Sequence, residues 1–219
     1  MSTAVWFYAE RGNSEGPISR EQLLRRLVQR RAEGPVLVWR EGLGAWTPAD
    51  AVPELSEAQA APWFAVGTTK LVVMSLVTLG LYEVYWFYRQ WKSVQAQASD
   101  AVHPVLGAIF SGLSGFWLFP RVRAAADEAG VRVGWSGAAM AAAYLLLSLL
   151  WRLPDPYWLA SFLSIVPLVQ VQSAVNAVND KRAPLAGRNE GFSGANWGGV
   201  VLGGLMLLLC LVGVLLPPA

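Results

Sequence analysis

Few side chains in this sequence could do chemistry, and the most informative is Glu83, a carboxylate inside an apolar and aromatic stretch. A carboxylate at membrane depth is costly, so it usually serves transport or pairs with another polar group. Glu83 therefore indicates a proton or cation path, with hydration at a membrane interface or pairing with Arg89 as the alternative. Gln170 and Gln172 lie in a later apolar stretch, where amides can form hydrogen bonds between helices.

Catalytic and metal sites are not predicted. The chain has one histidine, His103, and one cysteine, Cys210, which are too few for a disulfide or a metal site without other donors. It contains no phosphate-binding loop, no paired histidines and no nucleophile motif of the hydrolases. We therefore expect a protein that is not an enzyme and has neither cofactor nor metal. A net charge of +2 over 219 residues gives no indication of nucleic-acid binding.

The sequence predicts an integral membrane protein, because residues 191–219 contain no charged side chain. Within this stretch, Trp197 to Leu216 supplies twenty predominantly apolar positions, and about 20 are needed to cross a bilayer as a helix. The overall composition agrees, since charged residues are 15% of the chain against roughly 25% in soluble domains.

Apolar segments recur through the second part of the chain, at 70–88, 104–120, 134–151, 156–175 and 194–217. The last three are long and nearly free of charge, which predicts three membrane-spanning helices. A turn at 152–156 joins the third segment to the fourth as a helical hairpin. The first two are shorter and interrupted by glycines, so each either spans the membrane or is re-entrant. The expected architecture is a small α+β domain at 1–56, a linker at 57–67 and an all-α membrane bundle at 68–219.

Basic residues predict the orientation, because cytoplasmic loops carry an excess of lysine and arginine. Such clusters follow the second and fourth segments, whereas Arg152 stands alone between the third and fourth. We expect a bacterial inner-membrane protein with a cytoplasmic N-terminus and a periplasmic C-terminus. The start of the sequence, which lacks a basic stretch followed by an apolar core, agrees with a cytoplasmic N-terminus. The clusters are Arg121, Arg123 and Arg132, and Lys181, Arg182 and Arg188.

The final span has two different faces. Gly199 and Gly203 form a pair of small residues four positions apart, and Gly198 has Ala195 nearby. Small residues let another helix backbone approach closely. We therefore expect the N-terminal half of this helix to pack inside the bundle. The leucines further along are expected to face lipid; they are Leu207, Leu208 and Leu211.

Residues 4–56 read as a small globular domain with a β-like run, a turn, a helix and a second strand. Ser19 and Gln22 have the spacing of a capping box at the start of the helix. An ordered set of residues runs through this domain: Trp6, Tyr8, Gly16, Pro17, the leucines of the helix, Val38, Trp39, Trp46, Thr47 and Pro48. With this set the domain resembles the bacterial GYF-like domain, a relative of the eukaryotic GYF modules that bind proline-rich peptides.

The aromatic residues of this domain are the candidate peptide-binding surface, because polyproline II segments dock between flat aromatic rings. The candidates are Trp6, Tyr8, Trp39 and Trp46. A domain this small also needs aromatic residues in its core. Trp6 and Trp39 are expected to serve the core, and Tyr8 and Trp46 are the better candidates for an exposed platform.

The membrane half resembles an uncharacterised bacterial multi-helix membrane family, through 78–82, 85–88, Asn176, Asn179 and the motifs at 192–193 and 196–197. We expect an inner-membrane protein whose cytoplasmic domain binds a partner protein through a segment such as a proline-rich peptide. It also contacts membrane lipid, and self-association is left open. The alternative is a small transporter or channel that uses Glu83 and helix breaks at Gly80 and Pro167.

Overall fold

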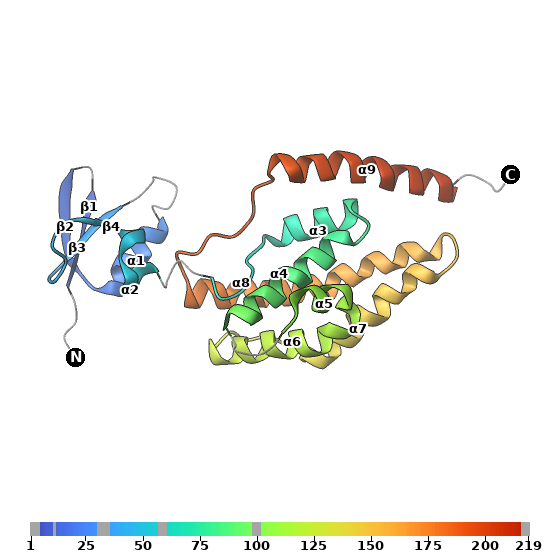
Figure 1. Cartoon of the computed structure of the whole chain (residues 1–219), viewed down its shortest axis with the longest axis horizontal. Helices are drawn as coiled ribbons and strands as arrows, with labels where there is room; N and C mark the ends of the chain where they lie inside the picture. Colours follow the sequence, from blue (N-terminus) through green and yellow to red (C-terminus); the bar gives the residue numbers. More distant parts are fainter. Residues whose placement is uncertain (1–4, 11, 30–35, 57–60, 98–101, 216–219) are drawn as a thin grey trace. The chain divides into compact units, whose positions relative to one another are not determined.

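The computed structural model describes residues 5–10, 12–29, 36–56, 61–97 and 102–215. The chain forms two compact units (Figure 1). The first contains the residues up to Pro62 together with Asn179–Gly187, and the second contains Trp63–Val178 and the residues from Arg188 onward. Of the expected linker, 57–60 lies outside the described residues, as does the end of the last apolar segment at 216–217.

The first unit is built on a four-stranded antiparallel sheet in the order β2-β1-β3-β4. Aromatic and β-branched residues favour strands, and they are frequent in β1 and β3. Gly16 in β2 has a φ of +143°, a conformation that is readily accessible to glycine. The strands are β1 (Trp6–Glu10), β2 (Asn13–Ile18), β3 (Leu37–Arg40) and β4 (Thr47–Pro48).

One face of the sheet packs against α1 (Arg20–Gln29). The predicted capping box is confirmed: the backbone N–H of Ser19 donates to Oε1 of Gln22 at 2.9 Å, and the N–H of Gln22 donates to Oγ of Ser19 at 3.2 Å. A 3-10 turn at Ala49–Ala51 and α2 (Pro53–Ser56) follow the sheet. The buried core of the unit consists of Trp6, Tyr8, Leu23, Leu27, Val38, Ala49, Val52, Leu55 and Leu185.

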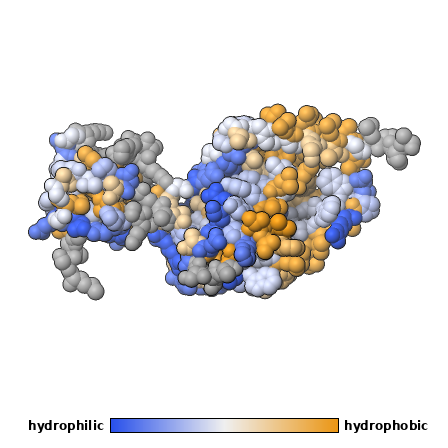
Figure 2. Space-filling model, viewed as in Figure 1, coloured by the Kyte–Doolittle hydropathy of each residue, from blue (hydrophilic) through white to orange (hydrophobic). Residues whose placement is uncertain are grey.

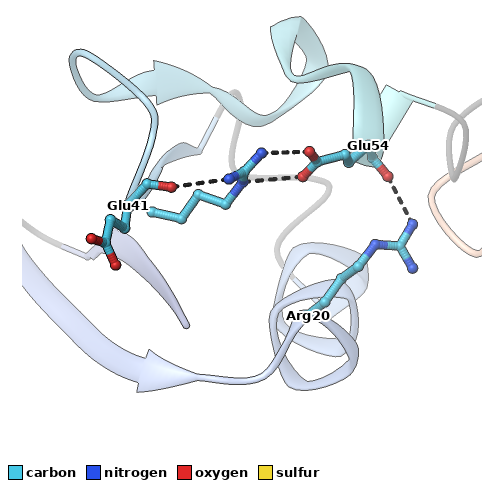
Figure 3. Close-up of polar contacts among 4 residues, drawn as sticks. Arg20, Glu41 and Glu54 are labelled. Atoms are coloured by element: carbon cyan, nitrogen blue, oxygen red, sulfur yellow. Dashed lines mark hydrogen bonds and ion pairs between the residues drawn. The ribbon is translucent and has the colours of Figure 1, made fainter. Parts of the chain in front are cut away.

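A polar clamp joins β3, α2 and the start of α1 (Figure 3). Nε and Nη2 of Arg40 donate to the two carboxylate oxygens of Glu54 as a fork. Nη1 of Arg40 also donates to the backbone carbonyl of Glu41 at 2.9 Å. Nη2 of Arg20 donates to the backbone carbonyl of Glu54 at 2.7 Å. Because Arg40 also lies over the ring of Trp6, at 5.4 Å from its centre, the clamp covers one edge of the core.

The second unit is entirely helical apart from one isolated bridge between Val66 and Asn189, over the residues that are described. Its helices are α3 (Thr68–Val77), α4 (Leu81–Gln97), α5 (Pro104–Ile109), α6 (Ser111–Glu128), α7 (Gly137–Leu149), α8 (Ile165–Arg182) and α9 (Gly194–Leu215), with 3-10 segments at Leu150–Arg152 and Tyr157–Ser164.

Each of the first two apolar segments is a pair of helices. The first divides at 78–80 into α3 and α4, because Leu79 and Gly80 have positive φ values of 51° and 87°. The N–H of Gly80 donates to the carbonyl of Ser75 at 2.9 Å, which ends α3. The second divides at Phe110 into α5 and α6. The 10-residue α3 is about 15 Å long, roughly half the thickness of a bilayer core.

Two helices, rather than the three expected, are long and apolar enough to cross a membrane, among the residues described. They are Tyr157–Arg182 and Gly194–Val214. The prediction for 134–151 is wrong in this respect, because that helix extends only over Gly137–Arg152. Pro167 does not break its helix, because it lies in the first turn of α8, where proline is tolerated. The predicted turn at 152–156 is confirmed.

The glycine face of α9 packs against α3 through Gly199 and Gly203. The expectation that the N-terminal half of α9 lies inside the bundle is wrong, because none of the residues Gly194–Val214 is buried. A methyl group added to Gly203 would lie 2.0 Å from the carbonyl oxygen of Val77, so the two backbones are in direct contact. One added to Gly199 would lie 3.5 Å from Met74. Leu208 is 55% exposed, in agreement with the predicted outer face.

Large hydrophobic side chains are exposed over much of the second unit. Figure 2 shows them over the region of α9 and the centre of the visible face. Soluble proteins rarely expose contiguous apolar patches beyond a few hundred Å², and the exposed apolar side chains of this unit are many. The exposed members on the helices include Leu81, Leu106, Ile109, Leu113, Trp117, Leu146, Leu163, Val166, Val201, Leu202, Leu205 and Leu209.

Candidate functional site

An aromatic row crosses the outer face of the sheet in the first unit. Phe7 in β1 and Trp39 in β3 are directly opposite each other in the antiparallel register. Their ring centres are 5.7 Å apart and the rings are tilted by 55°. The next pair in the ladder joins Val38 to Thr47, so the same register places Trp46 opposite Trp39. Residues opposite each other in a sheet share a face.

The row is partly open to solvent. Trp46 is 40% exposed, and Phe7 and Trp39 are half-buried. A side-chain carbon on Gly16 would lie 2.7 Å from both the Phe7 ring and the carbonyl oxygen of Trp6. The absence of a side chain at Gly16 therefore lets β2 lie tightly against Phe7. Pro17 beside it is exposed.

Trp6 and Tyr8 lie on the other face, whereas Trp39, which was expected in the core, lies half-buried on the outer face. Trp6 is 1% exposed, as expected for a core residue, but Tyr8 is 5% exposed, and the expectation that it stands on an open platform is wrong. Residues two apart in a strand point to the same face, so Tyr8 follows Trp6 into the core. The same alternation sends Phe7 outward. Sequence reasoning missed Phe7, although strict alternation along β1 would have found it.

A flat row of aromatic rings can bind an extended peptide. Polyproline II helices are already extended and have no internal hydrogen bonds, so they dock on aromatic grooves with little loss of entropy. Tryptophan offers a large flat surface and one N–H donor for a peptide carbonyl. The row of Phe7, Trp39 and Trp46 is therefore suited to binding and contains no group for acid–base or nucleophilic chemistry.

Glu83 lies in a separate buried cluster within the second unit. Its side chain is 6% exposed and sits among α4, α7 and the 3-10 segment before α8. The hydroxyl of Tyr144 donates to one carboxylate oxygen at 2.9 Å, and Oγ of Ser164 donates to the other at 3.4 Å. The alternative of a pair with Arg89 is not found, since Arg89 bonds to the hydroxyl of Tyr85. Over the described residues, the two hydrogen-bond partners of this carboxylate are neutral hydroxyls.

Gln172 is the centre of a buried amide network. Its Oε1 accepts from Nε1 of Trp86 at 2.6 Å and from Nε2 of Gln90 at 3.2 Å. Its Nε2 donates to Oδ1 of Asn176 at 2.8 Å and to the carbonyl of Phe64 at 3.3 Å. The prediction that Gln172 bonds between helices is confirmed. The network also holds the extended segment before α3, because amides of Gln90 and Asn176 bind backbone groups of Phe64 and Val66.

The other two polar candidates are at the surface of the second unit. Gln170 is exposed and makes no side-chain hydrogen bond to any described residue. Arg89 is half-buried, and its Nη1 donates to the hydroxyl of Tyr85 at 2.7 Å. Tyr144, Gln90 and the bonding role of Asn176 were missed, because a partner 61 residues away from Glu83 leaves no pattern in the local sequence.

Comparison with known proteins identifies the first unit. The family described as GYF domain 2 matches residues 6–55. The matched range covers all four strands, α1 and most of α2, and contains the whole aromatic row. No curated protein and no solved structure matches the chain. The N-terminal part of the chain is therefore a GYF-like domain, of the kind known for binding proteins through proline-rich peptides.

Proposed function

We propose that this chain is a bacterial inner-membrane protein whose cytoplasmic GYF-like domain recruits a partner protein, without catalysing a reaction. The observation that carries the proposal is the aromatic row of Phe7, Trp39 and Trp46 on a domain of the GYF family. Such a row offers the flat surface on which a proline-rich segment docks. The helical unit supplies the membrane location.

Membrane integration is supported by α9, because none of its residues Gly194–Val214 is buried within the protein. A helix that is apolar on every side and unburied requires lipid around it. The close contact of Gly203 with α3 supports membrane packing, because small residues drive helix association where the hydrophobic effect is absent. The apolar surface over α5, α6 and the hairpin at 152–156 would face lipid as well.

The proposed orientation has the GYF-like domain inside and the C-terminus outside. Leu185, which follows the basic residues at the end of α8, belongs to the buried core of the GYF-like domain. This packing supports a position of the loop after α8 on the same side of the membrane as this domain. Lys181 and Arg182 in that region favour the cytoplasm. In this arrangement α8 starts outside, so the segment between the GYF-like domain and α8 must cross the membrane an odd number of times, and a short helix such as Gly137–Arg152 has to make that crossing.

The peptide-binding role predicts a specific effect of Trp46. Replacing a tryptophan that is a hot spot of an interface commonly costs about 2 kcal/mol of binding free energy. We therefore expect Trp46→Ala to weaken binding of synthetic proline-rich peptides by the full chain in detergent by about tenfold or more. Isothermal titration calorimetry measures the dissociation constants.

The matched control is Trp151→Ala, which removes an exposed tryptophan from the second unit. It should leave peptide affinity unchanged. Equal losses in the two variants would indicate a general effect on the protein. A wild-type chain that binds no proline-rich peptide and captures no cellular protein contradicts the recruiting role.

A second function, transport, is favoured by one observation, the burial of Glu83 between two hydroxyl groups. A carboxylate in a membrane domain that takes up and releases a proton is a common element of proton pathways. The test is proton and cation flux into liposomes that contain the purified chain. Transport through Glu83 predicts flux that is lost in Glu83→Gln and kept in Glu190→Gln, an exposed carboxylate of the same unit. The recruiting function predicts no flux in any of them.

A further inference from the structure

Three cations on neighbouring helices of the second unit have no acidic partner among the described residues. Arg89 and Lys92 lie on α4, and Arg121 lies on α6. Each instead contacts an aromatic ring. By contrast, Arg123 pairs with Asp127 at 3.0 Å on the same helix as Arg121. No carboxylate of the described residues therefore neutralises the positive charge of Arg89, Lys92 or Arg121, whereas Arg123 has such a partner.

Arg89 is held in a defined position by two rings. Its guanidinium lies 4.4 Å from the centre of the Phe64 ring and 5.8 Å from that of Tyr85. One of its five N–H donors is used by the Tyr85 hydroxyl, at 2.7 Å. The remaining donors of a flat guanidinium can bind two oxygens of a phosphate side by side.

Lys92 and Arg121 extend this surface. The ammonium of Lys92 lies 5.8 Å from the centre of the Tyr88 ring. The guanidinium of Arg121 lies 5.8 Å from the ring of Trp91 on α4, so this cation of α6 lies beside α4, next to a ring outside the face that carries Arg89 and Lys92. Tyr85, Tyr88, Arg89 and Lys92 have helical spacings of three and four, so they share one face of α4. We call Arg89, Lys92 and Arg121 the cation band.

The surroundings of the cation band are those of a membrane interface. Along α4, exposed Leu81, Val84 and Tyr85 precede Arg89, and along α6, exposed Leu113, Phe116 and Trp117 precede Arg121. Each helix therefore passes from apolar residues through aromatic residues to a cation. Aromatic rings concentrate at the headgroup level of bilayers, and the cations beyond them reach the phosphates.

From this order and from the unpaired charge, we infer that the cation band is a binding site for the headgroup of an anionic phospholipid such as phosphatidylglycerol, with Arg89 as its anchor. The inference rests on the proposed membrane location and adds the class of lipid and the residues that select it. A zwitterionic headgroup has its own cation beside the phosphate, so it gains less from three positive side chains.

The test is lipid retention by the full chain in mixed micelles with equal amounts of phosphatidylglycerol and phosphatidylcholine, measured by native mass spectrometry. Wild type should retain phosphatidylglycerol preferentially. Arg89→Gln and Lys92→Gln should each reduce this preference by about fivefold, the size expected for one cation near an anionic surface. Arg89→Lys should retain part of it.

The matched control is Arg152→Gln, because Arg152 also lies over a tryptophan ring, at 6.0 Å, but at the turn that joins α7 to α8. Its lipid preference should equal that of wild type. Circular dichroism shows whether each variant is folded. If Arg89→Gln does not fold, Lys92→Gln still tests the site, because Lys92 is exposed.

Three outcomes would overturn the inference: no preference in wild type, an equal loss in Arg152→Gln, or displacement of the lipid by excess inorganic phosphate, which would indicate a site for soluble anions. The membrane location is tested separately by washing membranes with alkaline carbonate. A chain that is released by carbonate refutes the proposed function, whereas a chain that stays in the membrane without lipid preference refutes only the cation band.

Discussion

Replacing Gly203 by leucine is expected to lower the free energy of unfolding by about 3 kcal/mol or more, at the upper end of overpacking effects. The reason is that even the first side-chain carbon would lie 2.0 Å from the carbonyl oxygen of Val77. Because that obstacle is backbone, α9 must move away from α3 to make room. Thermal unfolding of the full chain in detergent, followed by size-exclusion chromatography after heating, measures the loss.

Gly204→Leu is the matched control, because a side chain at the next position meets nothing within 4 Å. It should change the stability by less than about 0.5 kcal/mol, as is usual for exposed sites. Leu208→Ala should also be mild, since Leu208 is exposed. Equal destabilisation by leucine at 203 and at 204 would show that helix propensity, rather than the contact of α9 with α3, determines the result.

Replacing Gln172 by leucine is expected to cost about 3 kcal/mol, because it leaves several buried polar groups without partners at 1–3 kcal/mol each. Nε1 of Trp86 would lose its 2.6 Å acceptor, and Oδ1 of Asn176 would lose its 2.8 Å donor. The side chain of Gln172 is fully buried, so water cannot replace these bonds at the surface. The stability of the full chain in detergent is the measurement.

Gln170→Leu makes the same chemical change two residues earlier on α8, at an exposed side chain. It should be neutral or slightly stabilising, because leucine suits a lipid-facing position better than an amide. Trp86→Phe combined with Gln172→Leu should cost less than the sum of the two single changes, since both remove the same bond. Additive losses would show that the network does not act as a unit.

The sequence predicted the first unit well where local patterns decide the structure. The capping box at Ser19 needs only two residues at the correct spacing, and it formed as expected. The sequence could also have predicted the face on which Tyr8 lies, because alternation along β1 places Tyr8 on the same side as Trp6. The residue type of Tyr8 favoured an exposed position, whereas strand periodicity predicts that Tyr8 faces the core and Phe7 faces outward. Periodicity was the better guide.

In the helical unit, the sequence located apolar segments but not their partners. The break at Gly80 was visible, since glycine is the residue that most readily adopts a positive φ. The bond from Tyr144 to Glu83 was not, because it depends on how α4 and α7 are rotated about their axes. The length of the third segment was overestimated at its start, because 134–136 are not helical and the helix extends only over Gly137–Arg152.

The amide network around Gln172 also bears on the order in which the protein can be assembled during synthesis. The carbonyl of Phe64 accepts hydrogen bonds from Gln90 and from Gln172, which lies 108 residues later in the chain. Val66 depends in the same way on Asn176, 110 residues later. The entry to the α3–α4 hairpin therefore stays incompletely bonded until α8 has left the ribosome, so this early segment is completed by one of the last helices to be made.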